Sequence, residues 1–270
     1  MVKLALLGTA HRPGMLADMR QTERLASVLE ALASDGSVDV AELVDRLGVS
    51  AATIRRDLHL LERQRMLTRT HGGAVAHGVL YELPLRYKAA RHQDEKRRIA
   101  AAAAARVSDG AVVGLTGGTT TTEVARAIVD RRGITVVTNA LNIAGELAIR
   151  ADLKLVVTGG TARTESYELV GPVAEQALGA INLDVAFVGV DGISIDSGLT
   201  THHEIEAGTN RSMIERARTV VVVTDSSKLG RAAFARICPI AAVDELITDA
   251  AAPSATVEAL TSAGVAVTVV

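Results

Sequence analysis

Apolar residues in the first third of the chain recur at helical spacing. One helix face carries Leu25, Val28, Leu29 and Leu32. That helix stops at "SDG", a second over "VDVAELVDRLG" breaks at Gly48, and a third opens at Ser50, a residue type that caps helix N-termini. The stretches "LTRT", "HGG" and "AVAH" then predict a two-stranded hairpin. Three short helices and a hairpin are typical of a winged helix-turn-helix, which we expect over residues 15–78.

Beyond Gly110 the pattern changes to short apolar runs separated by helical stretches such as "TEVARAIVDRR". The runs are "AVVGLT", "ITVVTN", "LKLVVTG", "VAFVGV", "TVVVVTD", "ELITD" and "VAVTVV". Strand, helix and strand at this spacing predict an α/β, doubly wound, mostly parallel sheet over residues 107–270. Between the two domains, residues 79–106 predict an extended linker around Pro84 and then a long helix from about residue 90, which we expect to couple the domains.

Composition fits this organisation and limits the partners. Of 270 residues 48% are apolar but only 2% aromatic, so aliphatic side chains must pack the core, as suits a parallel sheet. The net charge is −2, and any DNA-binding surface must therefore be local. The single cysteine, Cys238, excludes an internal disulfide and a multi-cysteine metal site, as expected of a reducing cytoplasm. No apolar run reaches the length of a membrane span.

The start of the chain has no organised pattern before Met15. We expect residues 1–14 to be a disordered extension or the product of a misassigned start, and not a signal peptide. The protein is therefore expected to be cytoplasmic, with no membrane partner and no cofactor.

The third predicted helix and the hairpin concentrate positive charge. Five arginines fall between Thr53 and His71, against two acids. With its apolar positions turned inward, the helix presents polar side chains on the opposite face, and its capped N-terminus can meet a DNA phosphate. The candidate DNA-binding residues are Ser50, Thr53, Arg55, Arg56, His59, Arg69 and His71. The alternative is a solvated helix face with charges paired at i,i+4 spacing.

This segment also carries a resemblance. "SAATIRRDLHLLERQRMLTRTHGGAV" resembles the signature of the DeoR family of bacterial repressors, through a Ser, then Thr-Ile-Arg-Arg-Asp-Leu, then Arg-x-His-Gly-Gly-Ala. The sequence departs from the family at "ERQRML", where many members carry a glycine before the wing. Members often begin close to the position of Met15. The resemblance implies double-stranded operator DNA as partner and a C-terminal domain similar to sugar-phosphate isomerases.

The stretch "LTGGTTTTEVA" closes the first strand of the second domain and opens a helix, an arrangement that binds phosphate in α/β proteins. Glycines allow close approach of an anion, threonines offer hydroxyl and amide donors, and Lys228 supplies a point charge after a later strand. A plain tight turn is the alternative. Neither a P-loop nor a G-x-G-x-x-G motif is present, which favours a small phosphorylated ligand over a nucleotide.

The resemblance extends to further strand ends, "VVTNAL", "VVTGGTAR", "VGVDGISIDSGLTT" and "VTDSSKLG". All stand where an open α/β sheet binds ligands. The candidate effector-binding residues are Thr116, Gly117, Gly118, Thr119, Thr120, Thr121, Asn139, Gly159, Gly160, Asp191, Gly198, Thr200 and Lys228.

Isomerisation of a sugar phosphate would need, besides a ligand-binding loop, a general base and a group that stabilises the enediol. The isomerases that this domain resembles carry acidic residues and a lysine around "GVDGISIDSGLTTHHE". Here Gly192 stands where a glutamate is found, and no lysine occurs between Lys154 and Lys228. The group "HHE", residues 202–204, could do acid–base work, although solvated residues at a helix start are the simpler interpretation. We expect no metal there, because adjacent histidines point to different sides.

Two hypotheses follow. The first is a regulator, not an enzyme, that represses a carbohydrate-metabolism operon and is relieved by a phosphorylated sugar or polyol. Half-sites in such operators imply a homodimer or higher homo-oligomer. The second is a sugar-phosphate isomerase or deaminase with an appended DNA-binding module.

Overall fold

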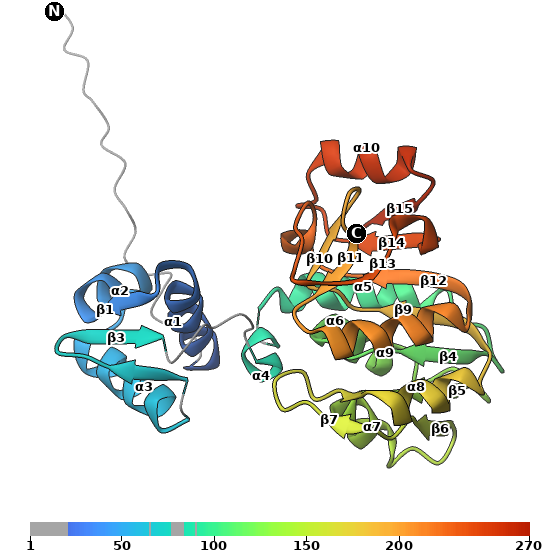
Figure 1. Ribbon diagram of the computed structural model, residues 1–270, viewed down its shortest axis with the longest axis horizontal. Coiled ribbons are helices and arrows are strands. Elements are labelled where there is room, and N and C mark those ends of the chain that lie inside the picture. Colours follow the sequence, from blue (N-terminus) through green and yellow to red (C-terminus); the bar gives the residue numbers. More distant parts are fainter. Residues whose placement is uncertain (1–20, 65, 77–83, 90) are drawn as a thin grey trace, which may run out of the picture. The chain divides into compact units, whose positions relative to one another are not determined.

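The computed structural model describes residues 21–64, 66–76, 84–89 and 91–270 (Figure 1). The chain divides into two compact units, Met1–Leu83 and Pro84–Val270. The predicted extension over residues 1–14 lies outside the described residues, and so does the beginning of the predicted linker.

Three helices and a small antiparallel sheet build the first unit. The helices are α1 (Gln21–Asp35), α2 (Val40–Leu47) and α3 (Ala51–Arg63), and the strands are β1 (Ser37–Asp39), β2 (Leu67–Arg69) and β3 (Gly73–Ala76). The sheet order is β1-β3-β2, so the predicted hairpin has a third strand. The sequence did not show β1, because three residues are too few to display a period of two.

The turns and caps of this unit follow from local chemistry. The side chain of Asp39 accepts a hydrogen bond from the amide of Ala41 at the start of α2, and Gly48 ends that helix in the left-handed conformation, with φ 66°. Ser50 caps α3 as predicted, because its side chain accepts a hydrogen bond from the amide of Thr53 at 3.2 Å.

A buried ion pair ties α1 to α3. The Asp57 side chain is only 1% exposed, and Arg24 meets both of its carboxylate oxygens, with Nε at 2.5 Å and a second nitrogen at 3.2 Å. Such a fork-shaped contact fixes the relative position of two helices better than a single hydrogen bond does. It holds α3 on the unit while the opposite face of the helix stays exposed.

The second unit is built on a seven-stranded sheet in the order β15-β14-β12-β9-β4-β5-β6. Every neighbouring pair in it is parallel. The strands are β4 (Val112–Leu115), β5 (Thr135–Thr138), β6 (Lys154–Val157), β9 (Leu183–Val188), β12 (Ala217–Val223), β14 (Glu245–Thr248) and β15 (Ala266–Val269). The seven apolar runs of the sequence are these seven strands, which confirms the predicted α/β class.

Helices cover both faces of the sheet (Figure 1). One face packs against α5 (Gln93–Ala104), α6 (Thr119–Ala127) and α7 (Leu141–Leu147), and the other against α8 (Pro172–Gly179), α9 (Glu204–Glu215) and α10 (Ser254–Ser262). Along β9 the side chains alternate, since Val185 and Phe187 join the first core while Ala186 and Val188 join the second. Helix α5 thus belongs to this unit's core and is not part of a separate linker.

Short strands and turns after the main strands complete the unit. A two-stranded sheet pairs β7 (Thr161–Ala162) with β8 (Leu169–Val170). A three-stranded sheet joins β10 (Gly192–Ser194), β11 (Gly198–Thr201) and β13 (Ala235–Cys238). The one-turn helix α4 (Leu85–Lys88) precedes α5, and η1 (Ser226–Lys228) and η2 (Ile240–Ala242) are 3-10 turns. In the described part of the chain, no helix has both the length and the apolar character needed to cross a membrane.

Candidate functional site

The outer face of α3 presents most of the predicted DNA-binding residues. Its apolar side chains Ile54, Leu58 and Leu61 are buried, whereas Arg55 and Arg56 are exposed on the other side of the helix. This division follows from the 3.6-residue period of the helix. The basic side chains are therefore free of the core and accessible to a groove of DNA.

The hairpin lies against the same helix. Nη1 of Arg69 is 3.5 Å from Nδ1 of His59 and 4.0 Å from Glu62, and the amide of Arg69 donates to Glu62 at 3.3 Å. His71 is exposed in the turn between β2 and β3. Residues from α3 and the wing thus share one surface, as a winged helix-turn-helix requires.

The glycine-threonine loop after β4 is closed by its own hydroxyls. Gly118 adopts φ 132°, and its carbonyl accepts hydrogen bonds from the hydroxyls of Thr121 at 3.0 Å and Thr122 at 2.7 Å. The hydroxyl of Thr116 accepts a hydrogen bond from the amide of Gly189 at 3.0 Å, and this bond ties the loop to the end of β9. Direct contact with an anion would therefore come from backbone amides at the start of α6 rather than from these hydroxyls.

Gly117 lies against a buried carboxylate that the sequence did not reveal. A Cβ at position 117 would lie 2.1 Å from Oε1 of Glu168, so only glycine fits. Glu168 is 2% exposed and accepts a hydrogen bond from Nδ2 of Asn139 at 3.4 Å. Within the described part of the chain, Oδ1 of Asn139 and Oγ of Ser166 are buried without a hydrogen-bond partner. Most buried polar atoms in proteins have a hydrogen-bond partner, so these two are open to a polar group or water.

A cluster of charges surrounds Asp191, in the segment after β9. Its Oδ1 atom is 3.0 Å from Nζ of Lys88, 3.7 Å from Nε2 of His202 and 3.9 Å from Nζ of Lys228. Burial acts to raise the pKa of Asp191, but the charges of these three neighbours outweigh it and hold that pKa well below its usual range. Asp191 and Lys228, both predicted site residues, therefore do lie together.

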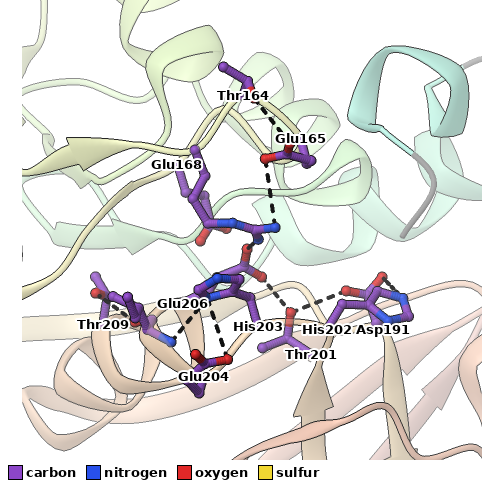
Figure 2. Close-up of polar contacts among 12 residues, drawn as sticks. Thr164, Glu165, Glu168, Asp191, Thr201, His202, His203, Glu204, Glu206 and Thr209 are labelled. Carbon is purple, nitrogen blue, oxygen red and sulfur yellow. Dashed lines mark hydrogen bonds and ion pairs between the residues drawn. The ribbon is translucent and has the colours of Figure 1, made fainter. Parts of the chain in front are cut away.

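A second buried carboxylate, Glu206, lies beside this cluster (Figure 2). The hydroxyl of Thr201 lies between the two acids, 3.2 Å from Oδ2 of Asp191 and hydrogen-bonded to Glu206. Nη1 of Arg163 is 2.5 Å from the other oxygen of Glu206. The arginine and the hydroxyl each bind one of the two carboxylate oxygens, which compensates the cost of burying this polar group and fixes the side chain in one place.

The group "HHE" is divided among different roles. His202 faces Asp191, whereas the ring of His203 accepts the amide of Ile205 at 3.2 Å and caps α9. The Glu204 side chain is 68% exposed. Among the residues that the structure describes, no three His, Cys, Asp or Glu side chains are placed to hold a metal ion.

Four other predicted residues make structural contacts instead. A Cβ on Gly198, whose φ is 68°, would lie 2.2 Å from the carbonyl oxygen of Cys238, and the Thr200 hydroxyl donates to the carbonyl of Gly192 at 3.1 Å. Gly159 and Gly160 follow the edge strand β6, and a Cβ on Gly160 would meet the backbone of β8 at 2.8 Å. Of the four, Thr200 also borders the charged cluster, because its carbonyl accepts a hydrogen bond from the amide of Asp191 at 3.0 Å.

Sequence reasoning missed the residues that come from outside the strand ends. Lys88 lies 103 positions before Asp191 and was assigned to a linker, although it makes the shortest ion pair of the cluster. Arg163, Glu168 and Glu206 lie in loops or on a helix flank, where no periodic pattern marks them.

Comparison with known proteins agrees with this architecture. Residues 24–77 match the DeoR-like helix-turn-helix domain, and residues 91–250 match the DeoR C terminal sensor domain. The HTH-type transcriptional regulator GlpR of Haloferax volcanii is 39% identical over 250 residues, which cover 92% of this chain and 98% of that protein. The glycerol-3-phosphate regulon repressor of Escherichia coli strain K12 is 34% identical over 243 residues, covering 90% and 96%.

A solved structure is similar only in part. Ribose 5-phosphate isomerase A from Methanocaldococcus jannaschii aligns with a TM-score of 0.39 and 22% sequence identity, over 51% of this chain and 55% of that one. The relatives that match nearly the whole chain are named as regulators, and this chain is a regulator and not an enzyme. Its two units carry the two domains of one family: the chain belongs to the DeoR family of transcriptional regulators.

Proposed function

We propose that the protein represses a carbohydrate-metabolism operon and that a phosphorylated sugar or polyol, bound in the second unit, relieves repression. The observation that carries this proposal is the convergence of Lys88 and Lys228 on Asp191, beyond the ends of β9 and β12. Ligands of open α/β sheets bind at the carboxyl ends of the strands. Lysine ammonium groups supply point charges for phosphate, and buried carboxylates accept hydrogen bonds from hydroxyl groups.

The name of one relative supports the same ligand class. The Escherichia coli protein, 34% identical to this chain, is named for a glycerol-3-phosphate regulon, and glycerol 3-phosphate is a phosphorylated polyol. The site has both chemical parts for such a ligand, namely cations for the phosphate and, for hydroxyls, the buried Glu168 and Asn139 with the half-buried Asp191.

We assign operator binding to α3 and the wing. Arg55 and Arg56 are exposed on α3 behind a capped N-terminus, where they can reach guanine edges or phosphates in the major groove. A repressor of this kind acts as a dimer or higher oligomer on paired half-sites. For the effector to release DNA, it must bind the DNA-incompetent arrangement more tightly, because equal affinity for both would shift nothing.

A thermal-shift panel followed by an operator-release assay tests the proposal. Glycerol 3-phosphate and triose, pentose and hexose phosphates are added to the full chain, with the unphosphorylated compounds as matched controls. A ligand at 100 times its Kd stabilises the bound unit by about 2.7 kcal/mol, which is easily detected. We expect at least one phosphorylated compound, and none of the controls, to raise Tm and to release the protein from promoter DNA. If no compound does either, the proposed effector class is wrong.

A further inference from the structure

Lys96 is a buried lysine in the first turns of α5. It is 3% exposed, and its ammonium donates to the carbonyl of Lys88 at 2.9 Å and to that of Arg91 at 2.6 Å. Burial lowers its pKa to about 8. A buried cation is costly to a fold and is rarely kept without a role. Here its ammonium holds the carbonyls of Lys88, at the end of α4, and Arg91, before α5, close together.

The two residues whose carbonyls bind Lys96 are themselves basic and lie near Lys228. The side chain of Lys88 meets Asp191 at 3.0 Å, and the guanidinium of Arg91 interacts with Asp225 and with Lys228. Asp225 is the N-cap of η1, the turn that carries Lys228. The end of α4 and η1 are neighbours, because Lys88 and Lys228 both contact Oδ1 of Asp191.

Among the residues that the structure describes, positive charge exceeds negative charge in this partly buried region. The basic members are Lys88, Arg91, Lys96 and Lys228, all of them buried or half-buried. Against them stand Asp191 and Asp225, while Glu123, which also faces Lys96, is paired with Arg126 at 2.6 Å. Like charges gathered away from water repel one another unless a counter-charge joins them. A phosphate ester carries up to two negative charges and three acceptor oxygens, which suits this excess.

We propose that Lys88 and Arg91 are part of the effector site, where they bind the effector's phosphate together with Lys228, and that Lys96 is the positioning residue that holds the backbone of both. This inference rests on the proposed function, since it names the groups that hold the same ligand. The phosphate replaces Asp191 as a partner of Lys88. Lys88 ends α4, the helix with which the second unit opens after Pro84.

The test uses isothermal titration calorimetry on the full chain with the phosphorylated compound that gives wild type the largest thermal shift, and separately with inorganic phosphate. Lys88→Gln and Arg91→Gln are each expected to weaken binding of both probes by at least about tenfold, the loss of one charge-assisted contact. The matched control is Arg97→Gln, because Arg97 is also on α5 but its side chain is 59% exposed and faces Asp94. That variant should bind as wild type does.

Lys96→Met should lower the affinity for both probes by a similar factor, while its circular dichroism spectrum and operator affinity stay unchanged. Lys96→Gln replaces it if the methionine variant does not fold. Inorganic phosphate has no sugar. A loss of affinity for it therefore reports on the phosphate contacts themselves rather than on general loosening of the pocket. Unchanged affinity in both Lys88→Gln and Arg91→Gln would overturn the inference and leave the proposed function standing. If wild type binds none of the phosphorylated compounds, the proposed function fails, and the inference fails with it.

Discussion

The ammonium of Lys88 lies 3.0 Å from the carboxylate of Asp191, although 103 positions separate the two residues. The pair joins the segment that follows the DNA-binding unit to the loop after β9, in the middle of the parallel sheet. Its side chains are 19% and 12% exposed, so it is partly shielded from water. In such a pair, removing one partner leaves the other charge uncompensated.

Replacing Asp191 by Asn should therefore destabilise the second unit by about 3 kcal/mol at neutral pH. The folded protein holds the pKa of Asp191 below its unfolded value, so this stabilisation is present above pH ~4 and is lost as pH falls further. Urea unfolding at pH 7 and pH 3.5 measures both effects. The difference between wild type and Asp191→Asn should shrink at the lower pH; a difference that is constant with pH would contradict the charge-based explanation.

Lys96 also makes the stability of the second unit depend on pH, but here burial of a cation, rather than pairing of a carboxylate, shifts the pKa. Its pKa is lowered to about 8 in the folded protein, so between pH 8 and its unfolded value near 10.5 the unfolded chain binds more protons. The contribution of Lys96 to stability therefore rises with pH across that window, by up to about 3 kcal/mol. The groups that face it are Asp225, Lys228, Arg91 and Glu123.

The measurement for Lys96 is urea unfolding of wild type and Lys96→Met at pH 7.5 and pH 9.5. Wild type should gain stability relative to the variant as the pH is raised. Since the other titrating groups are common to both proteins, their contributions cancel in the difference. Parallel behaviour of the two proteins would show that Lys96 is not the group that titrates.

Lys228→Ala should leave operator affinity within about twofold of wild type but raise the effector concentration for half-release by about 10- to 100-fold, the cost of one charge-assisted phosphate contact. Fluorescence anisotropy on labelled promoter DNA, with and without the phosphorylated compound, measures both quantities. Lys154→Ala is the matched control, because Lys154 is exposed on the edge strand β6. A Lys228→Ala protein that responds to effector as wild type does would remove this lysine from the site.

Arg55→Ala combined with Arg56→Ala should weaken specific operator binding more than about 100-fold at physiological salt, since each base or phosphate contact contributes roughly 1–3 kcal/mol. Both side chains are exposed, so circular dichroism and Tm should not change. Arg218→Ala is the control, an arginine with an 80% exposed side chain on β12. Wild-type affinity in the double variant would show that α3 is not the recognition helix.

The sequence by itself determined the elements that depend on periodicity and local chemistry. Seven apolar runs became the seven parallel strands, Ser50 became the cap of α3, and Ile54, Leu58 and Leu61 became its buried face. Each of these outcomes depends on residues a few positions apart. A period of 3.6 or 2 and a capping hydroxyl are therefore visible in the chain before it folds.

Only the tertiary structure decided which distant residues share a site. Lys88, Glu168 and Glu206 lie outside the strand ends, yet they contact or lie beside Asp191 and Gly117, while Gly198 and Thr200 are used to build a small sheet. Short strands such as β1, β7 and β10 show no period either. Contacts of this kind come from how helices pack on a sheet and how loops return to it. Charge and burial at such places are properties of the folded arrangement, not of any stretch of sequence.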